Sequence, residues 1–338
     1  MAVSIQEVAE RAGVSQATVS KVLNKTEIRF KQETSERVHN AARELGYRPN
    51  VVARRLARQR TETIGLMVSM LDNPFFLNVL QESESRIFRA GYHVLLDANC
   101  NDYANYQPLH QISGWLVDGV LMWSPSYSSL TRYLGAHAEN IPVVYLGHLR
   151  DDGGDACAFD LYGAGRQVMG HLIERGYRRL CYVSDHPLEH VVGENNQVLA
   201  IRALCAENGL ELEIAVVDPR DIAGSCFCLA QEIAARPREL RPDAVVCSND
   251  HMALAVYPGL IRGGLRVPED IALVGFDGIA QSKYLPHGPL TTVRMPVDTL
   301  CARALEILWR RIDSSGRDVE MPPQSVLIPT ELVIGATT

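Results

Sequence analysis

Residues 4–24 read SIQEVAERAGVSQATVSKVLN, and this stretch predicts two short helices joined by a tight turn. Ser4 is followed three residues later by Glu7, which is the pattern of a capping box at a helix start. Apolar residues recur at helical spacing on both sides of Gly13. These positions are Ile5, Val8, Ala9, Ala12, Val19, Val22 and Leu23. Two helices around a three-residue turn that contains glycine form a helix-turn-helix.

A third helix is expected between Glu33 and Leu45, with Gly46 at its C-terminal cap and Pro49 preventing its continuation. Its inward positions are Val38, Ala41, Ala42 and Leu45. Lys31 stands just before this helix, and a lysine side chain cannot accept the hydrogen bond of an N-cap. The sequence therefore predicts a small all-α head over residues 1–46. The start of its third helix is expected to fray or to be capped in another way, with Lys31 available to face a phosphate.

The second helix carries the candidate DNA-reading side chains. In a helix-turn-helix this helix lies in the major groove, and its N-terminal residues meet the base edges. Gln16 can pair with adenine, Ala17 can contact a thymine methyl group, and Lys21 can donate to guanine. The residues of the head that we place at the DNA are Ser15, Gln16, Ala17, Thr18, Ser20, Lys21 and Asn24. The alternative is a three-helix bundle whose exposed glutamine and lysine are only solvated.

Charge separates this head from the rest of the chain. Residues 1–60 hold 12 lysines and arginines against 6 acidic residues, whereas residues 61–338 hold 21 against 34. A basic head on an acidic body indicates a polyanionic partner for the head alone, because the body would be repelled by the same partner.

From residue 61 onward, short apolar runs alternate with amphipathic stretches long enough to form helices. The expected strands are Ile64–Val68, His93–Asp97, Gly119–Trp123, Val143–Leu146, Leu180–Ser184, Ala244–Cys247 and Ile271–Val274. This alternation predicts parallel sheets in two successive Rossmann-like halves. A ligand of such sheets is expected at the carboxyl ends of the strands.

Several function classes find no support in the sequence. No apolar run reaches the length of a membrane span, and the N-terminus has no basic flank followed by an apolar segment, so we expect neither membrane insertion nor secretion. The 8 cysteines include no CxxC pair, and we expect all of them to be buried thiols in a reducing cytoplasm. The glycines of residues 163–170 lack the spacing of a dinucleotide site, and no catalytic or zinc motif is evident. We therefore expect no cofactor, no metal and no enzymatic activity.

Seven motifs follow one another along the chain in a specific order. They are IQEVAERAGVSQATVSKVLN, TSERVHNAARELGYRPNVVARRLARQRTETIGL, DNPFF, CSNDHMALAV, VPEDIALVGFDGI, PLTTVRMPV and IPTELVIG. In order and spacing they resemble the lactose-repressor/galactose-repressor (LacI/GalR) family of bacterial transcription regulators. The resemblance covers essentially the whole chain. It implies a helix-turn-helix head (residues 1–46), a hinge helix or linker (47–60) and an α/β periplasmic-binding-protein-like core of two Rossmann-like subdomains (61–338).

The resemblance also implies that the chain crosses between the two subdomains three times. We expect the crossings near Asp160–Gly163, Pro289–Thr292 and Glu320–Pro323. The N-subdomain would then comprise residues 61–160 and 292–320, and the C-subdomain residues 163–289 and 323–338.

The segment from Asn50 to Arg58 is helical by propensity, but so short a helix is marginal alone in water. The resemblance implies a hinge helix that forms on DNA and pairs with its twofold mate in the minor groove. Its predicted DNA contacts are Asn50, Ala53, Arg54 and Leu56. Leu56 would wedge between base steps and kink the DNA. The alternative is a charged linker in which Leu56 is merely exposed.

The resemblance implies a small-molecule effector in the core. Carried over residue by residue, the matching effector positions are Ser69, Asn73, Phe75, Phe76, Asn249 and Asp277. Carboxylate and amide groups in a cleft are typical of hydroxyl recognition. Asn249 and Asp250 also have an interpretation as caps of the helix that follows them, and the two roles are compatible.

Three positions of the implied effector site depart from the family pattern. Gln197 stands where the family has an arginine, and Ile222 where it has an aromatic ring. Gly147, followed by His148, stands where it has an aspartate. Without the arginine, bidentate capture of a carboxylate or phosphate is disfavoured. We therefore predict an uncharged, sugar-like effector, with His148, Gln197, Ile222 and Asp277 in its site. The alternative is a pocket that binds no small molecule.

The functional prediction is a sequence-specific transcriptional regulator in the cytoplasm, a repressor whose DNA binding a small molecule controls. Its expected partners are a pseudo-palindromic double-stranded operator, the effector and a second copy of the chain in a twofold homodimer. A ligand-independent repressor is the alternative within the family. A solute-binding protein would share the core but would need a signal peptide and no basic head.

Overall fold

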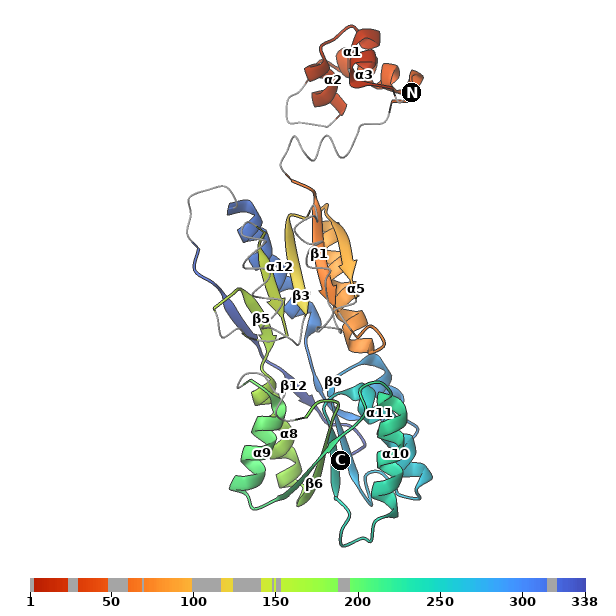
Figure 1. Ribbon diagram of the computed structural model, residues 1–338, viewed down its shortest axis with the longest axis vertical. Coiled ribbons are helices and arrows are strands. Elements are labelled where there is room, and N and C mark those ends of the chain that lie inside the picture. Colours follow the sequence, from red (N-terminus) through yellow and green to blue (C-terminus); the bar gives the residue numbers. More distant parts are fainter. Residues whose placement is uncertain are drawn as a thin grey trace. The chain divides into compact units, whose positions relative to one another are not determined.

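The computed structural model describes residues 3–23, 30–47, 60–68, 70–98, 117–123, 141–147, 149, 153–187, 195–314 and 321–338. The chain divides into two compact units, Met1–Thr61 and Glu62–Thr338, which we call the head unit and the body (Figure 1).

The described part of the head unit forms α1 (Ile5–Ala12), α2 (Gln16–Leu23) and α3 (Gln32–Glu44). The Glu7 carboxylate accepts a hydrogen bond from Ser4 N at 2.7 Å, and Ser4 Oγ accepts one from Glu7 N at 3.3 Å, so the expected capping box is confirmed. Gly13 ends α1 in the left-handed conformation, with φ 64°. Glycine adopts this conformation without steric cost, which allows the chain to turn directly into α2.

Apolar side chains from all three of these helices form the core of the head unit. The buried members are Val8, Ala9, Ala12, Val19, Val22, Val38, Ala41 and Ala42. Ile5, Leu23 and Leu45 pack against them partly buried, so every inward position predicted from the sequence contributes. α3 begins after Lys31, whose side chain makes no capping hydrogen bond, as its lack of an acceptor requires.

The first sheet of the body, the N-lobe sheet, has the strand order β11-β5-β4-β3-β1-β2. Its strands are β1 (Thr63–Val68), β2 (His93–Asp97), β3 (Gly119–Trp123), β4 (Val143–Leu146), β5 (Ala156–Phe159) and β11 (Ser325–Ile328). All of their pairings are parallel. α5 (Pro74–Arg89) and α12 (Val297–Ser314) pack against the sheet and against each other, so they cover the same face.

The second sheet, the C-lobe sheet, has the order β12-β10-β9-β8-β6-β7. Its strands are β6 (Arg179–Ser184), β7 (Glu211–Val216), β8 (Ala244–Cys247), β9 (Ala272–Asp277), β10 (Thr291–Arg294) and β12 (Glu331–Val333). β12 is antiparallel to β10, and the other pairings are parallel. The helix pair α8 (Leu161–Glu174) and α9 (Gln197–Glu207) covers one face, and the pair α10 (Ile222–Ala235) and α11 (Asp250–Arg262) covers the other (Figure 1).

All strands expected from the sequence are present. β2, β3, β4 and β8 have the predicted bounds, and β1 and β6 begin one residue earlier. β9 begins one residue later than expected, at Ala272, and extends to Asp277. Five further strands, β5, β7, β10, β11 and β12, were not predicted from the sequence. β7 reads ELEIAV, in which two glutamates alternate with apolar residues, and it therefore lacks the continuous apolar run by which a buried strand is recognised.

The second crossing between the lobes lies later in the chain than predicted. The first follows Phe159, as expected, because β5 belongs to the N-lobe sheet and β6 to the C-lobe sheet. We expected the second near Pro289–Thr292, but β10 pairs with β9 in the C-lobe sheet. The crossing therefore lies between Arg294 and Val297.

The third crossing also requires correction. We expected it near Glu320–Pro323, but β11 pairs with β5 in the N-lobe sheet, with Ser325 opposite Ala156. The crossing lies between Ile328 and Glu331, so the late segments of the two lobes are residues 297–328 and 331–338. Both errors arise because a strand's own residues do not reveal its partner strand.

The side chain of Asn195 forms hydrogen bonds with the backbone on both sides of the first crossing. Asn195 lies just before α9 and donates from Nδ2 to the Phe159 carbonyl at 2.7 Å. Its Oδ1 accepts from Tyr162 N at 3.0 Å. Both ends of one side-chain amide are thus used to connect the C-lobe to the chain that leaves the N-lobe.

The other two crossings are held in a similar way. Gln167 on α8 accepts from Leu332 N at 2.9 Å and donates to the Thr330 carbonyl at 3.1 Å. At the second crossing, Met295 N donates to the Asp277 carbonyl at 3.2 Å. Each crossing therefore has a hydrogen bond to a residue of the C-lobe.

The cysteines differ in burial. Cys157, Cys181, Cys205, Cys226, Cys247 and Cys301 are buried, but Cys228 is exposed, so the expectation that all of them are buried is wrong for Cys228. It follows Cys226 by two positions on α10, and two helical positions turn a side chain by about 200°. Cys100 lies outside the described residues.

Thr337 and Thr338 pack into the C-lobe. Thr337 Oγ1 donates to the Leu273 carbonyl at 2.6 Å. Thr338 Oγ1 lies 2.8 Å from His171 Nε2 and 2.8 Å from Thr291 Oγ1. Burial, reinforced by the positive charge of Arg175, lowers the pKa of His171 and thereby favours the neutral imidazole.

Candidate functional site

α2 presents the predicted DNA-reading residues on its outer face. Gln16, Ala17 and Lys21 are exposed, while Val19 and Val22 on the same helix are buried in the core. The helix is therefore anchored through one face and offers the other at fixed geometry. An amide, a methyl group and an ammonium on this face are the groups that major-groove readout uses.

Ser15 has a structural role at the start of α2. Its Oγ accepts from Thr18 N at 3.1 Å and lies 2.9 Å from Thr18 Oγ1. Ser15 thus caps the helix, and Thr18 and Ser20 are half-buried. The remaining predicted contacts, Asn24, Asn50, Ala53, Arg54 and Leu56, lie outside the described residues.

Strand order locates the candidate ligand site in the body. In the N-lobe sheet β1 lies between β2 and β3, and in the C-lobe sheet β6 lies between β7 and β8, so the direction of strand addition reverses at β1/β3 and at β6/β8. Ligands of open α/β sheets bind outside the carboxyl ends of the strands at such switch points. Val68 pairs with Trp123 at the first, and Val183 with Cys247 at the second.

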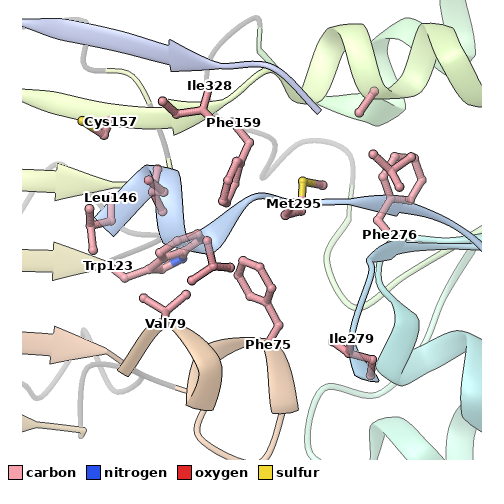
Figure 2. Packing of buried hydrophobic residues seen from close by; sticks show 14 of the residues in the cluster. Phe75, Val79, Trp123, Leu146, Cys157, Phe159, Phe276, Ile279, Met295 and Ile328 are labelled. Carbon is pink, nitrogen blue, oxygen red and sulfur yellow. The ribbon is translucent and has the colours of Figure 1, made fainter. Parts of the chain in front are cut away.

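Aromatic rings gather at the switch point of the N-lobe sheet. Phe75 and Phe76 begin α5, Trp123 ends β3 and Phe159 ends β5. Phe75 meets Phe76 and Trp123 edge-on, with ring centroids 5.3 Å and 5.5 Å apart. Figure 2 shows the rings of Phe75, Trp123 and Phe159 pointing toward one another from three different elements. Asn73 is buried and caps α5, since its Oδ1 accepts from Phe75 N at 3.0 Å.

Among the predicted effector residues of this lobe, Phe75 lies in the core and Phe76 is half-buried. Ser69 and His148 lie outside the described residues. Trp123 was not predicted as a candidate site residue, although it is the last residue of a predicted strand.

The C-lobe contributes residues at the starts of three helices. Asn249 caps α11 by accepting from Met252 N at 2.9 Å. Gln197, the first residue of α9, donates from Nε2 to the Ser248 carbonyl at 3.4 Å, which connects α9 to the end of β8. Gln197 Oε1 is buried and has no hydrogen-bond partner among the described residues. Ile222 begins α10 and packs, half-buried, on the apolar cluster under that helix.

Asp277 ends β9 in a conformation that is unusual for a residue with a side chain, with φ 106°. The turn after it is held by Asp250, a fully buried carboxylate. Asp250 accepts from Thr292 Oγ1 at 2.6 Å and from Ile279 N at 2.9 Å. Backbone strain of this kind is sustained only where the surroundings over-determine it, which is common at binding sites.

The pKa values of both carboxyl groups are raised. Burial raises the pKa of Asp250 to about 7, although the hydrogen bonds from Thr292 and Ile279 oppose the rise. Burial is the main cause that raises the pKa of Asp277 well above its usual range, and the negative charge of Asp250 adds to it.

Within the described ranges, no group of three or more histidine, cysteine, aspartate or glutamate residues is placed to hold a metal ion. None of the helices in those ranges combines the length and the apolar character needed to cross a bilayer.

Relatives of known sequence cover nearly the whole chain. Residues 4–50 match the family described as bacterial regulatory proteins, lacI family, and residues 169–338 match the periplasmic binding protein-like domain. A protein named HTH-type transcriptional repressor PurR from Vibrio atlanticus is 34% identical over 340 residues, which cover 96% of this chain and 97% of that protein. Its namesake from Shigella sonnei is 30% identical, over 98% of this chain and 95% of that protein.

Solved structures agree with this relationship. The lac repressor dimer bound to operator and the anti-inducer ONPF superposes with a TM-score of 0.84 at 25% identity, over 100% of this chain and 99% of that chain. The complex of the transcriptional regulator CelR with cellobiose gives a TM-score of 0.70 at 26% identity. The superposition covers 99% of this chain and 100% of that chain. The chain belongs to the lacI family of bacterial regulatory proteins.

Proposed function

We propose that this protein is a cytoplasmic, sequence-specific DNA-binding repressor, not an enzyme, that reads a pseudo-palindromic operator as a homodimer. The observation that carries the proposal is the exposed face of α2, where Gln16, Ala17 and Lys21 stand on a helix anchored in a basic unit. Support comes from the related proteins named transcriptional repressors and from the lac repressor dimer on its operator.

We further propose that a small uncharged molecule, bound at the carboxyl ends of the two sheets, controls this activity. Gln197, Asn249 and Asp277 supply polar groups from the C-lobe. The sequence has no lysine or arginine between Arg179 and Arg202, around the start of α9, to capture a carboxylate or phosphate. Binding that favours one arrangement of the lobes would change operator affinity through a coupling free energy, typically about 1–3 kcal/mol.

One observation favours a second candidate, a repressor that needs no ligand. Phe75, Phe159, Phe276, Ile279 and Met295 belong to one buried apolar cluster that joins the ends of both sheets (Figure 2). Such packing can hold the lobes together without a small molecule. The two candidates make the same prediction for DNA binding and opposite predictions for ligand binding.

Operator selection tests the DNA-binding function. The full chain is used to select sites from random double-stranded DNA, and the affinity of the selected site is then measured for Gln16→Ala and Lys21→Ala. Each variant should lose about 1–3 kcal/mol of discrimination at one base position. Gln6→Ala, at an exposed glutamine on α1, is the matched control. The head assignment fails if Gln16→Ala and Lys21→Ala bind the selected site as tightly as the unchanged protein.

A thermal-shift screen of the full chain tests effector control. A ligand present at about 100 times its dissociation constant stabilises the protein by about 2.7 kcal/mol. A neutral compound whose effect is lost in Asp277→Ala supports the effector site. A charged compound that binds there contradicts the assignment of Gln197, and operator binding without any ligand response supports the second candidate.

A further inference from the structure

The chain enters the body through Glu62, whose backbone has an unusual conformation. The division between the two compact units falls between Thr61 and Glu62, and β1 begins at Thr63. Glu62 has φ 51°, in the left-handed region that residues with a side chain rarely adopt. Such a conformation is strained and persists only where the surroundings determine it. Glu62 must therefore be held by its neighbours.

Residues at the starts of the two strands that flank β1 hold Glu62. Its N–H donates to Asp118 Oδ2 at 2.9 Å, and Asp118 directly precedes β3. Its carbonyl accepts from His93 N at 2.9 Å, and His93 begins β2. Asp118 N in turn donates to the Thr63 carbonyl at 2.9 Å. Both polar groups of the Glu62 backbone are thus bonded, and we call this arrangement the Glu62 clamp.

The C-lobe sheet has a counterpart of the Glu62 clamp at the start of β6. Asp243 directly precedes β8, and its carboxylate accepts from Arg178 N at 2.9 Å. The Arg178 carbonyl accepts from Glu211 N, at the start of β7, at 3.0 Å. Arg178 therefore corresponds to Glu62. In the same way, Asp243 corresponds to Asp118.

The two arrangements differ in backbone conformation. Among the described residues that carry a side chain, those with a positive φ are Glu62, Met70 and Asp277, so Arg178 has an ordinary φ. The chain before Arg178 comes from α8 of the same lobe, whereas the chain before Glu62 comes from the head unit. The left-handed conformation thus belongs to the copy that joins the head unit to the body.

A fixed backbone at this position matters for a dimer on DNA. Two heads that occupy the half-sites of one operator must bind a defined number of base pairs apart. Each residue with free dihedral angles between a head and its body lowers the effective concentration of the second head once the first is bound. Non-specific DNA imposes no such spacing. The gain from a fixed Glu62 is therefore expected for the operator alone.

We propose that Asp118 is a positioning residue for operator binding, because it holds Glu62 in the conformation that sets the backbone direction between the head unit and the body. The inference rests on the proposed operator binding by a homodimer. Loss of the Glu62 clamp weakens binding to two correctly spaced half-sites and relaxes the spacing requirement, while a single half-site is bound as before.

The test uses the full chain and DNA from the operator selection, with affinities measured by fluorescence anisotropy. The DNAs are the operator, a single half-site, and operators whose half-sites are moved one base pair closer together or further apart. Asp118→Ala should weaken operator binding by about tenfold and leave half-site binding unchanged. It should also lose most of the discrimination against altered spacing that the unchanged protein shows. Asp118→Asn keeps an oxygen that can accept from Glu62 N and should retain most of the operator affinity.

Asp243→Ala is the matched control, because it removes the corresponding carboxylate of the C-lobe. Melting temperatures should fall by a similar few degrees in Asp118→Ala and Asp243→Ala, since each leaves a backbone N–H without its acceptor. Operator affinity should fall only in Asp118→Ala. A general loss of stability would affect operator binding in both variants alike.

A second pair of variants tests the conformation of Glu62 itself. Glycine adopts a positive φ without steric cost, so Glu62→Gly should retain operator affinity. Valine is a genuine outlier in this region, so Glu62→Val should weaken operator binding by about as much as Asp118→Ala. Arg178→Val, at the corresponding position with an ordinary φ, should bind the operator normally. If Asp118→Ala does not fold, the comparison of Glu62→Val with Arg178→Val decides.

Three outcomes overturn the inference while the proposed DNA-binding function stands. Asp118→Ala binds the operator as tightly as the unchanged protein, or it weakens operator and half-site binding equally, or Asp243→Ala weakens operator binding as much as Asp118→Ala does. If the unchanged protein selects no operator, the proposed function fails and the inference fails with it.

Discussion

Asn195 and Phe159 lie in different lobes and are joined by a 2.7 Å hydrogen bond from the Asn195 side chain to the Phe159 carbonyl. Asn195 stands two residues before Gln197, the first residue of α9 and a candidate effector contact. Phe159 belongs to the aromatic group at the end of the N-lobe sheet. A single amide thus connects the candidate ligand residues of one lobe to the backbone of the other.

Replacing Asn195 with alanine should destabilise the body. The change leaves the Phe159 carbonyl and the Tyr162 N–H without their partner, and a buried polar group left unpaired costs about 1–3 kcal/mol. The free energy of unfolding, measured by denaturant titration of the full chain, checks this value. Asn208→Ala removes an exposed asparagine at the other end of α9 and should cost less than about 0.5 kcal/mol. Equal losses in the two variants would show that the connection between the lobes adds no stability.

Replacing His171 with glutamine should reduce the sensitivity of the protein to acid. Burial lowers the pKa of His171 in the folded state, so protonation favours the unfolded chain. The stability that the neutral imidazole contributes is present above the unfolded pKa of about 6.5 and is lost as the pH falls below it. Between pH 7.5 and pH 5, denaturant titrations should show a larger loss of stability for the unchanged protein than for His171→Gln. His93→Gln, at an exposed position, is the control, and a loss in His171→Gln as large as in the unchanged protein would contradict the prediction.

Cys228 should react with a thiol reagent in the folded protein, because it is exposed on α10. Burial raises the pKa of Cys181 and of Cys226 to about 12, so these thiols are neither accessible nor ionised at neutral pH. Cys228→Ser should remove one rapidly reacting thiol from the native protein, as measured with Ellman's reagent, and Cys226→Ser should remove none. An unchanged rapid phase in Cys228→Ser would show that its exposure is misassigned.

Leu56→Ala should weaken binding to the selected operator more than binding to unrelated DNA. An apolar wedge contributes only where the DNA is kinked to receive it. Arg58 lies in the same segment, and its guanidinium is expected to contact a phosphate. Arg58→Ala is therefore the comparison, since the loss of a phosphate contact should weaken both kinds of binding alike and reduce the slope of log affinity against log salt concentration by about 1. Fluorescence anisotropy at several salt concentrations distinguishes the two patterns. If Leu56→Ala also weakens both kinds of binding alike, Leu56 is not a wedge.

Much of the fold could be predicted from the sequence because its signals are local. The Ser4–Glu7 capping box, Gly13 and the apolar spacing of the head act within a few residues of one another, and they yielded all three helices of its described part. The buried strands β3 and β8 are apolar throughout, so their bounds could be read directly. Edge strands such as β7 have alternating exposure and lack this signal.

The features that were missed depend on distant partners. The position of the third crossing follows from the pairing of β11 with β5, in which Ser325 lies opposite Ala156. The sequence of neither strand indicates that the other is its partner. The packing of Trp123 depends on rings on α5 and β5 and on the bare backbone of Gly147. A sequence shows that Gly147 lacks a side chain, but only the folded chain shows what fills the space.

The corrected crossings also define suitable junctions for chimeric proteins. Each passage between the lobes is short, and hydrogen bonds to the C-lobe hold all three of them. Chimeras that exchange the N-lobe with a related protein therefore require junctions at only three places, after Phe159, after Arg294 and after Ile328. If Asn195 and Gln167 are retained, an exchanged N-lobe would bring its own strand ends to an unchanged C-lobe. The contribution of each lobe to ligand preference could then be measured separately.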